Sequence, residues 1–156
     1  MGRKFLGVCL VIVLLVSAAT GTGFALQEMQ VFYLDVGQAE STLLRGSDFT
    51  ILIDAGNWGN RDVLEFLHSV GVETINLFII THPHADHIGQ AAEVLRTFEV
   101  LEVWMSGYEH TTQLFEDVLD AVLEGDADYY EPRAGEVFDF GQLRVEVLHP
   151  EEIGAN

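Results

Sequence analysis

The spacing of apolar residues divides the chain into short strands and helices. Strand-forming residues predict strands over residues 30–36, 41–45 and 49–53. Apolar residues at helical spacing predict helices over residues 60–70, 89–98 and 111–123. A continuous apolar run predicts a strand buried on both faces over residues 75–80, and a further strand is expected over residues 100–105. A hairpin is expected over residues 136–140 and 143–148.

This order of elements predicts an α/β fold in which a mixed sheet carries helices on one face. Three strands come first, helices and strands then alternate, and the hairpin follows. Sheets of this kind usually place their chemistry at the carboxyl ends of strands. Residues 82–88 are expected to form a loop at such an end, because they follow the apolar run 75–80 directly.

The strongest chemical signal lies in this loop, where residues 81–89 have the sequence THPHADHIG. Histidine and aspartate are preferred ligands of zinc and similar divalent ions. His82 and His84 are two residues apart, so in an extended loop they project to one side and can hold one ion. Asp86 and His87 are expected to point elsewhere and to suit a second ion. The alternative, a polar loop with exposed histidines, fits a lone H-x-H better than four ligand-type residues.

Other polar residues close predicted strands and are candidates for supporting the site. Asp35 and Asp54 each follow an apolar segment, and Gln38 lies shortly after Asp35. Such residues orient ligand histidines or order the loop backbone in metal sites. The alternative is that they are turn formers at the ends of strands.

Three histidines lie outside the loop. His110 precedes the helix predicted from residue 111, and His149 precedes Pro150 after a predicted strand. Both are weaker candidates for metal ligands. His68 is expected on the exposed face of the first helix.

The first 25 residues have the layout of a secretory signal, with a basic start, an apolar run over residues 5–16 and small residues after it. Cleavage is expected after Ala25 or Ala19. The alternative is an uncleaved membrane anchor over residues 5–26. Either way the domain is expected outside the cytoplasm. Cys9 is the single cysteine and lies in this segment, so an internal disulfide framework is excluded.

The composition is strongly acidic. The 156 residues carry 25 acidic and 7 basic side chains, for a formal net charge of -18. This charge argues against holding nucleic acid or membrane by bulk electrostatics. Lys4 is the only lysine, which suggests a protein that works in high salt. GC-rich coding is the alternative explanation for the missing lysine.

Residues 81–89 resemble the HxHxDH signature of the metallo-β-lactamase-fold hydrolases. The resemblance implies that His82 and His84 bind one metal and that Asp86 and His87 bind a second, with Asp86 taking part in catalysis. The implied cofactors are two divalent ions, zinc or manganese. Such a pair lowers the pKa of a bridging water and stabilises developing negative charge.

Further segments are similar to the secreted, ComEC-type branch of this fold, and the resemblance covers residues 29–156. They are YLDVGQAES at residues 33–41, ILIDAG at residues 51–56, VWMSG at residues 103–107 and VLHP at residues 147–150. Relatives usually have Gly and Asp where this chain has Ala39 and Glu40. Ala39 therefore puts a left-handed turn at that position in doubt.

The later His-His-Gly-Ser motif of the family does not occur in the 156 residues, and their one Gly-Asp pair, Gly125-Asp126, directly follows a predicted helix and is not taken as the family's later Gly-Asp motif. The chain is therefore expected to be the N-terminal half of an αββα sandwich, lacking a C-terminal half as its partner. Four ligands shared between two ions predict weak metal binding and little activity for this part alone.

The function that this resemblance implies is a secreted metal-dependent hydrolase. Its expected substrates are phosphoesters or nucleic-acid-type molecules, either small or phosphodiester, and membrane contact is expected only through residues 5–26 if they are uncleaved. One alternative is a non-catalytic or incomplete metal-binding module. Another is an accessory component of DNA uptake.

Overall fold

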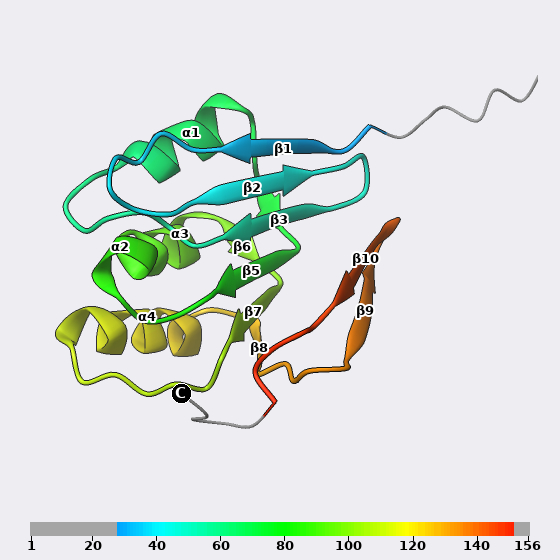
Figure 1. The fold of residues 1–156 in the computed structure, drawn as a ribbon. Helices are drawn as coiled ribbons and strands as arrows, with labels where there is room; N and C mark the ends of the chain where they lie inside the picture. Colours follow the sequence, from blue (N-terminus) through cyan, green and yellow to red (C-terminus); the bar gives the residue numbers. More distant parts are fainter. Residues whose placement is uncertain (1–27, 152–156) are drawn as a thin grey trace, which may run out of the picture.

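A six-stranded mixed sheet forms the centre of the computed structural model, which describes residues 28–151 (Figure 1). The spatial order is β1-β2-β3-β5-β7-β8. The strands are β1 (Gln30–Tyr33), β2 (Thr42–Arg45), β3 (Thr50–Ile53), β5 (Leu77–Ile80), β7 (Glu102–Met105) and β8 (Asp128–Tyr130). The first three pair antiparallel, and β3, β5, β7 and β8 pair parallel. The predicted mixed sheet is confirmed.

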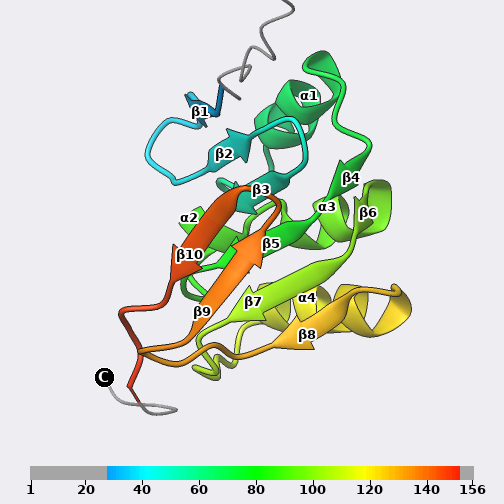
Figure 2. The ribbon, with the colours of Figure 1, turned by 90° about the vertical axis from the view of Figure 1, so that its right-hand side faces the viewer.

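Helices cover one face of this sheet, as predicted, and a hairpin covers part of the other (Figures 1 and 2). The helices are α1 (Asp62–Ser69), α2 (Ala85–Ile88), α3 (Ala91–Thr97) and α4 (Gln113–Glu124). The hairpin consists of β9 (Val137–Phe140) and β10 (Leu143–Glu146). In Figure 2 the hairpin lies in front of the sheet and the helices lie behind it.

Side chains along the central strands point alternately to the two faces of the sheet, and each face carries one hydrophobic cluster. Leu52, Phe78 and Val103 lie side by side in the ladder and belong to the larger cluster, which the helices complete. Ile51 and Leu77 are also paired, but they belong to the smaller cluster beneath the hairpin. The continuous apolar run that ends at residue 80 is therefore buried on both faces, as its sequence predicted.

Helix α4 shows how local sequence and packing agree. Thr112 caps its first turn, and its hydroxyl accepts a hydrogen bond from the backbone N–H of Phe115. Phe115, Val118 and Val122 are buried at three- and four-residue spacing, which gives the helix one apolar face. The helix ends before Gly125. Its amphipathic pattern is enough to explain its position on the sheet.

Trp104 connects the sheet to the hairpin. Its ring centroid lies 4.5 Å from that of Phe138 and 5.6 Å from that of Phe140. The indole is 2% exposed, and its N–H donates to Glu102 Oε1 at 2.7 Å. This tryptophan therefore fills the space between two layers while its polar atom stays satisfied.

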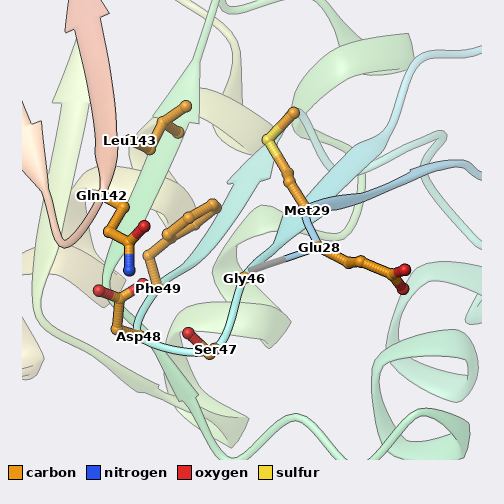
Figure 3. A pocket seen from close by; sticks show the side chains of 8 residues that line it. All are labelled: Glu28, Met29, Gly46, Ser47, Asp48, Phe49, Gln142 and Leu143. Carbon is orange, nitrogen blue, oxygen red and sulfur yellow. The ribbon is translucent and has the colours of Figure 1, made fainter. Parts of the chain in front are cut away.

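The turn of the hairpin meets the turn between β2 and β3, at the sheet edge opposite to the histidine loop. A Cβ atom on Gly141 would lie 2.4 Å from the carboxylate of Asp48, so the two turns are in close contact. A cavity of about 170 Å³ lies beside them, with Phe49, Gln142 and Leu143 in its wall (Figure 3). This contact fixes the outer end of the hairpin.

Two predicted strands are each broken by a change of sheet. Instead of one strand over 75–80 and one over 100–105, β4 (Thr74–Ile75) and β6 (Glu99–Val100) form a separate parallel pair. The break at Asn76 has a physical cause, because its side-chain Oδ1 accepts from the backbone N–H of Thr50 at 2.7 Å. The prediction of continuous strands was wrong at these positions.

Other boundaries also differ from the sequence prediction. The strand predicted over 30–36 ends at Tyr33, and strand β8 was not predicted because all three of its residues are exposed. Residues 82–88 are not only a loop, since the one-turn helix α2 occupies their second half. The helix predicted from Gly89 begins at Ala91 as α3.

The described residues contain no helix that is both long and apolar enough to cross a membrane. The predicted signal or anchor over residues 1–25 lies outside the described residues.

The two tryptophans provide a matched test of the packing. Trp104→Ala removes the contact between sheet and hairpin and is expected to lower the free energy of unfolding by about 3–5 kcal/mol. Trp58→Ala removes a side chain that is 72% exposed, so its effect should stay within about 0.5 kcal/mol. Urea denaturation followed by circular dichroism measures both. Equal losses in the two variants would contradict the described hairpin packing.

Candidate metal centre

The candidate site lies where the parallel strands β3, β5 and β7 end (Figure 1). Their carboxyl ends meet at one edge of the sheet. Asp54 follows β3, Thr81 follows β5 and Ser106 follows β7. The histidine loop, residues 82–88, follows β5 and therefore leaves this edge between Asp54 and Ser106.

Asp54 is the buried centre of this edge, with 3% of the residue exposed. Its Oδ1 accepts from the Thr81 backbone N–H at 2.9 Å, and its Oδ2 accepts from the Thr81 hydroxyl at 2.7 Å. Oδ2 also lies 2.7 Å from His87 Nδ1. A carboxylate can remain charged when buried if its oxygens are hydrogen-bonded in this way.

The backbone of Asp54 is held in an uncommon conformation. Its φ of 57° lies in the left-handed region, which aspartate tolerates better than most residues. The Ser41 hydroxyl donates to the Asp54 carbonyl at 3.0 Å, and the Asp54 N–H donates to the Ile79 carbonyl at 2.9 Å. These contacts fix the direction in which the carboxylate points.

The hydrogen bonds assign protons to two of the histidines. An ionised Asp54 carboxylate can only accept, so its hydrogen bond places the proton of His87 on Nδ1 and leaves the lone pair of the neutral ring on Nε2. The Thr81 hydroxyl donates its one proton to Asp54, so it accepts from His82 Nδ1, which lies 3.2 Å away. In their neutral forms, His82 and His87 therefore both have an unprotonated Nε2, whose lone pair can bind a metal ion.

The three imidazoles of the loop form one cluster. The ring centroid of His82 lies 3.8 Å from that of His87 and 4.6 Å from that of His84. Burial lowers the pKa of His82, and the neighbouring His87 and His84 lower it further, whereas Asp54 and Asp86 act in the opposite direction. Neutral imidazole is the form that binds metals, so the cluster favours ligand chemistry.

The loop spacing predicted that His87 points away from His82, but the centroids of the two rings are 3.8 Å apart. Asp86 lies beside His87, with its Oδ2 3.7 Å from His87 Nε2, and its side chain is 49% exposed. Among the described residues, no three His, Cys, Asp or Glu side chains converge as a metal-holding group. The donor types and the free Nε2 atoms suit a divalent ion, but these side chains are not closed around one point.

The short helix α2 is clamped between two loops by backbone hydrogen bonds. The His87 carbonyl accepts from Ala55 N–H at 2.7 Å, and the Asp86 carbonyl accepts from Glu40 N–H at 3.0 Å. Gly89 N–H donates to the Gly56 carbonyl at 2.9 Å. The two residues that could hold a second ion therefore lie on a rigid turn.

Gly89 is required by a close approach of two backbones. A Cβ atom at this position would lie 2.1 Å from the carbonyl carbon of Asn57 and from the nitrogen of Trp58. The next residue, Gln90, is 2% exposed, and its Oε1 accepts from Val63 N–H at 3.1 Å. These contacts join the histidine loop to the start of α1.

Sequence reasoning missed three residues that build this site: Ser41, Thr81 and Gln90. Thr81 adjoins the motif, Ser41 ends the segment similar to ComEC-type proteins, and Gln90 is a polar residue at the start of an apolar helix. Each acts through a hydrogen bond to a segment distant in the sequence, so local patterns indicate only that the residue is unusual.

The weaker ligand candidates lie at different distances from the cluster. The ring centroid of His110 lies 5.7 Å from that of His84, and its Nδ1 is 3.1 Å from Thr112 Oγ1. His149 is exposed and lines a cavity of about 210 Å³ together with Thr81. The structure thus places His110 near the imidazole of His84, and it places His149 near Thr81, the residue before the histidine loop.

Asp35 and Gln38 are exposed, and in residues 28–151 neither forms a hydrogen bond or ion pair with the histidine loop. Their supporting roles remain predictions. The left-handed position in their segment is Gly37, with a φ of 69°, so the alanine at position 39 meets no left-handed backbone. His68 is exposed on α1, as expected, and its ring lies 4.8 Å from that of Phe98.

Comparisons of the sequence and of the structure with known proteins find the same superfamily. The sequence model of the metallo-beta-lactamase superfamily matches residues 34–154. ComE operon protein 3 of Bacillus subtilis (strain 168) is 27% identical over 146 residues, which cover 80% of this chain and 18% of that protein. The chain therefore spans less than a fifth of the length of this curated relative.

Solved structures show the same fold. Rm3 metallo-beta-lactamase superposes with a TM-score of 0.55 and 20% identity, over 76% of this chain and 48% of that one. The metallo-beta-lactamase fold protein YhfI from Bacillus subtilis has a TM-score of 0.55 and 14% identity, over 75% of this chain and 51% of that one. The chain thus spans about half of each solved domain.

The close approach at Gly89 gives a test of the clamp. Gly89→Ala is expected to lower the free energy of unfolding by about 2–3 kcal/mol, because the new methyl group overlaps two backbone atoms. Gly125→Ala is the control, since a Cβ there comes no closer than 3.4 Å to its nearest neighbour. Urea denaturation should show a change of about 0.5 kcal/mol or less for the control. A Gly89→Ala protein as stable as the control would refute the clamp.

Proposed function

Because the chain belongs to the metallo-beta-lactamase superfamily, we propose that it is the metal-binding part of a secreted hydrolase that cleaves phosphoester or nucleic-acid-type substrates. Proteins of this superfamily are generally hydrolytic and usually bind metal ions, typically zinc. The observation that carries the proposal is the Asp54–His87 hydrogen bond beside the cluster of imidazoles. It prepares histidine nitrogens for metal binding at the edge where this fold class places its chemistry.

The proposed ligands are His82 and His84 for one ion and Asp86 and His87 for a second, as zinc or manganese. A bound pair of such ions supplies an activated water and positive charge against the developing oxyanion. Asp54 keeps the His87 ring fixed through Nδ1, and Thr81 does the same for His82. The half-exposed Asp86 carboxylate is the proposed proton acceptor for the reacting water.

We propose that a further half completes the coordination. The chain spans about half of each solved domain that it matches, and the four ligands leave two ions under-coordinated. The chain alone should therefore bind metal weakly and hydrolyse slowly. Secretion is part of the proposal and rests on the signal-like residues 1–25.

The substrate class rests on two supports. The relative from Bacillus subtilis is ComE operon protein 3, which agrees with the resemblance to ComEC-type proteins and favours nucleic-acid-type substrates or an accessory role in DNA uptake. The net charge of -18 excludes affinity from bulk attraction, so substrate contacts must be local to the site. High external salt would weaken the repulsion of a phosphodiester.

A second candidate is a metal-binding module without catalysis. It is favoured by the chain's coverage of only about half of each solved domain that it matches, because a half-built site can hold a metal without turning over a substrate. The two candidates agree on metal binding and differ in turnover.

Metal titration tests the proposed ligands. The purified chain should bind zinc in isothermal titration calorimetry, and the double variant His82→Ala, His84→Ala should bind at least about tenfold more weakly. His68→Ala removes an exposed histidine on α1 and should leave the affinity unchanged. If the double variant binds zinc as tightly as the parent chain, the ligand assignment is wrong.

Hydrolysis of a phosphodiester separates the two candidates. A slow, zinc- or manganese-dependent release of nitrophenol from bis(p-nitrophenyl) phosphate, absent in Asp86→Asn, supports the hydrolase. Tight metal binding with no turnover above the Asp86→Asn protein supports the non-catalytic module.

A further inference from the structure

Three large aromatic side chains are exposed at the same edge of the sheet as the histidine loop. Tyr33 is 84% exposed, Trp58 is 72% exposed and Tyr108 is 41% exposed. Strands β1, β3 and β7 all run in one direction, because β1 and β3 each pair antiparallel with β2 while β3, β5 and β7 are parallel. Tyr33 ends β1, Trp58 lies in the loop after β3, and Tyr108 lies in the loop after β7.

The loop that carries Trp58 is firmly attached to the candidate site. Asn57 Oδ1 accepts from the Trp58 backbone N–H at 2.8 Å, and the Asn57 carbonyl accepts from Gln90 Nε2 at 3.5 Å. The Trp58 backbone packs against Gly89, two residues after His87. These contacts fix the backbone that carries the indole, so a ligand that stacks on Trp58 has to order only its side chain.

The loop that carries Tyr108 also leads to the histidines. Ser106 Oγ accepts from the Tyr108 backbone N–H at 3.4 Å, and the same loop carries His110, near His84. Arg133 Nη1 donates to the Ser106 carbonyl at 3.4 Å, so the start of this loop is tied to the segment before the hairpin. Aromatic side chains therefore lie on both sides of the histidine loop.

The charges near this edge do not favour recognition of a phosphate backbone. Arg61 forms an ion pair with Glu93, and Arg133 Nη2 lies 2.9 Å from Glu131 Oε2. With a net charge of -18, phosphates gain nothing from long-range attraction. Bases that stack on aromatic rings are the part of a nucleic acid that such a surface can still bind.

We propose that Tyr33, Trp58 and Tyr108 form a stacking rim that binds the bases of a single-stranded nucleic acid beside the histidine loop. The inference extends the proposed function by assigning its substrate to the single-stranded class. It rests on that function for the substrate but needs no bound metal. It also implies an uncommon salt response: because few phosphates are neutralised and salt screens the repulsion from the net charge of -18, affinity should not fall between 0.1 M and 1 M NaCl.

Intrinsic fluorescence tests the rim directly, because Trp58 and Trp104 are the two tryptophans of the chain. Trp104 is buried, so quenching by a large added ligand reports on Trp58. An eight-nucleotide thymidine strand is added to the chain in the presence of EDTA, and an abasic strand of equal length is the reference probe. The thymidine strand should quench the emission and the abasic strand should not.

Variants measured by anisotropy of the labelled thymidine strand complete the test. Trp58→Ala should weaken binding by about five- to 100-fold, and Trp58→Phe should restore most of it because a ring remains. Leu123→Ala is the control, since Leu123 is 82% exposed but lies near the end of α4. Unchanged circular dichroism verifies that the Trp58 variants are folded.

Equal quenching by both strands, or equal binding by the Trp58→Ala chain, would overturn the stacking rim. These outcomes are separable from failure of the proposed function, because the fluorescence experiment contains no metal. Stacking without zinc binding would leave the rim and remove the hydrolase. Zinc binding at the histidines without stacking would leave the hydrolase and remove the rim.

Discussion

The buried carboxylate of Asp54 is the interaction on which the candidate site depends. It accepts hydrogen bonds from Thr81 and His87, which flank residues 82–86 in the sequence. A carboxylate that is nearly excluded from water is costly without such partners, so the charge and the loop geometry stabilise each other. The Ser41 hydroxyl holds the left-handed backbone that aims it. The same contacts leave Nε2 free on His82 and His87.

Much of the frame around this carboxylate could be predicted from the sequence. Strands β2 and β3 and helices α1 and α4 follow strong local patterns, and the structure agrees with them within a few residues. The histidine loop stands out because four ligand-type side chains crowd into it, whatever the fold. Asp54 was a candidate because it ends an apolar strand, and the parallel pairing of β3 with β5 places it beside Thr81.

The remaining features depend on contacts that local patterns do not encode. Helix α2 has only four residues, too few for helical periodicity to appear. The split at Asn76 follows from a side-chain hydrogen bond to Thr50, which is 26 residues away. Gly89 owes its identity to the backbone of Asn57, and the Ser41–Asp54 bond joins two strands. Such constraints become visible only when the chain is folded.

The tautomer of His87 is the most direct test of this account. Long-range proton–nitrogen NMR spectra of the ¹⁵N-labelled, metal-free chain distinguish Nδ1–H from Nε2–H imidazole. The account predicts that neutral His87 carries its proton on Nδ1, and that this signal pattern is lost in Asp54→Ala but not in Asp35→Ala. A His87 protonated on Nε2 in the parent chain would contradict the claim that Asp54 prepares this histidine for a metal.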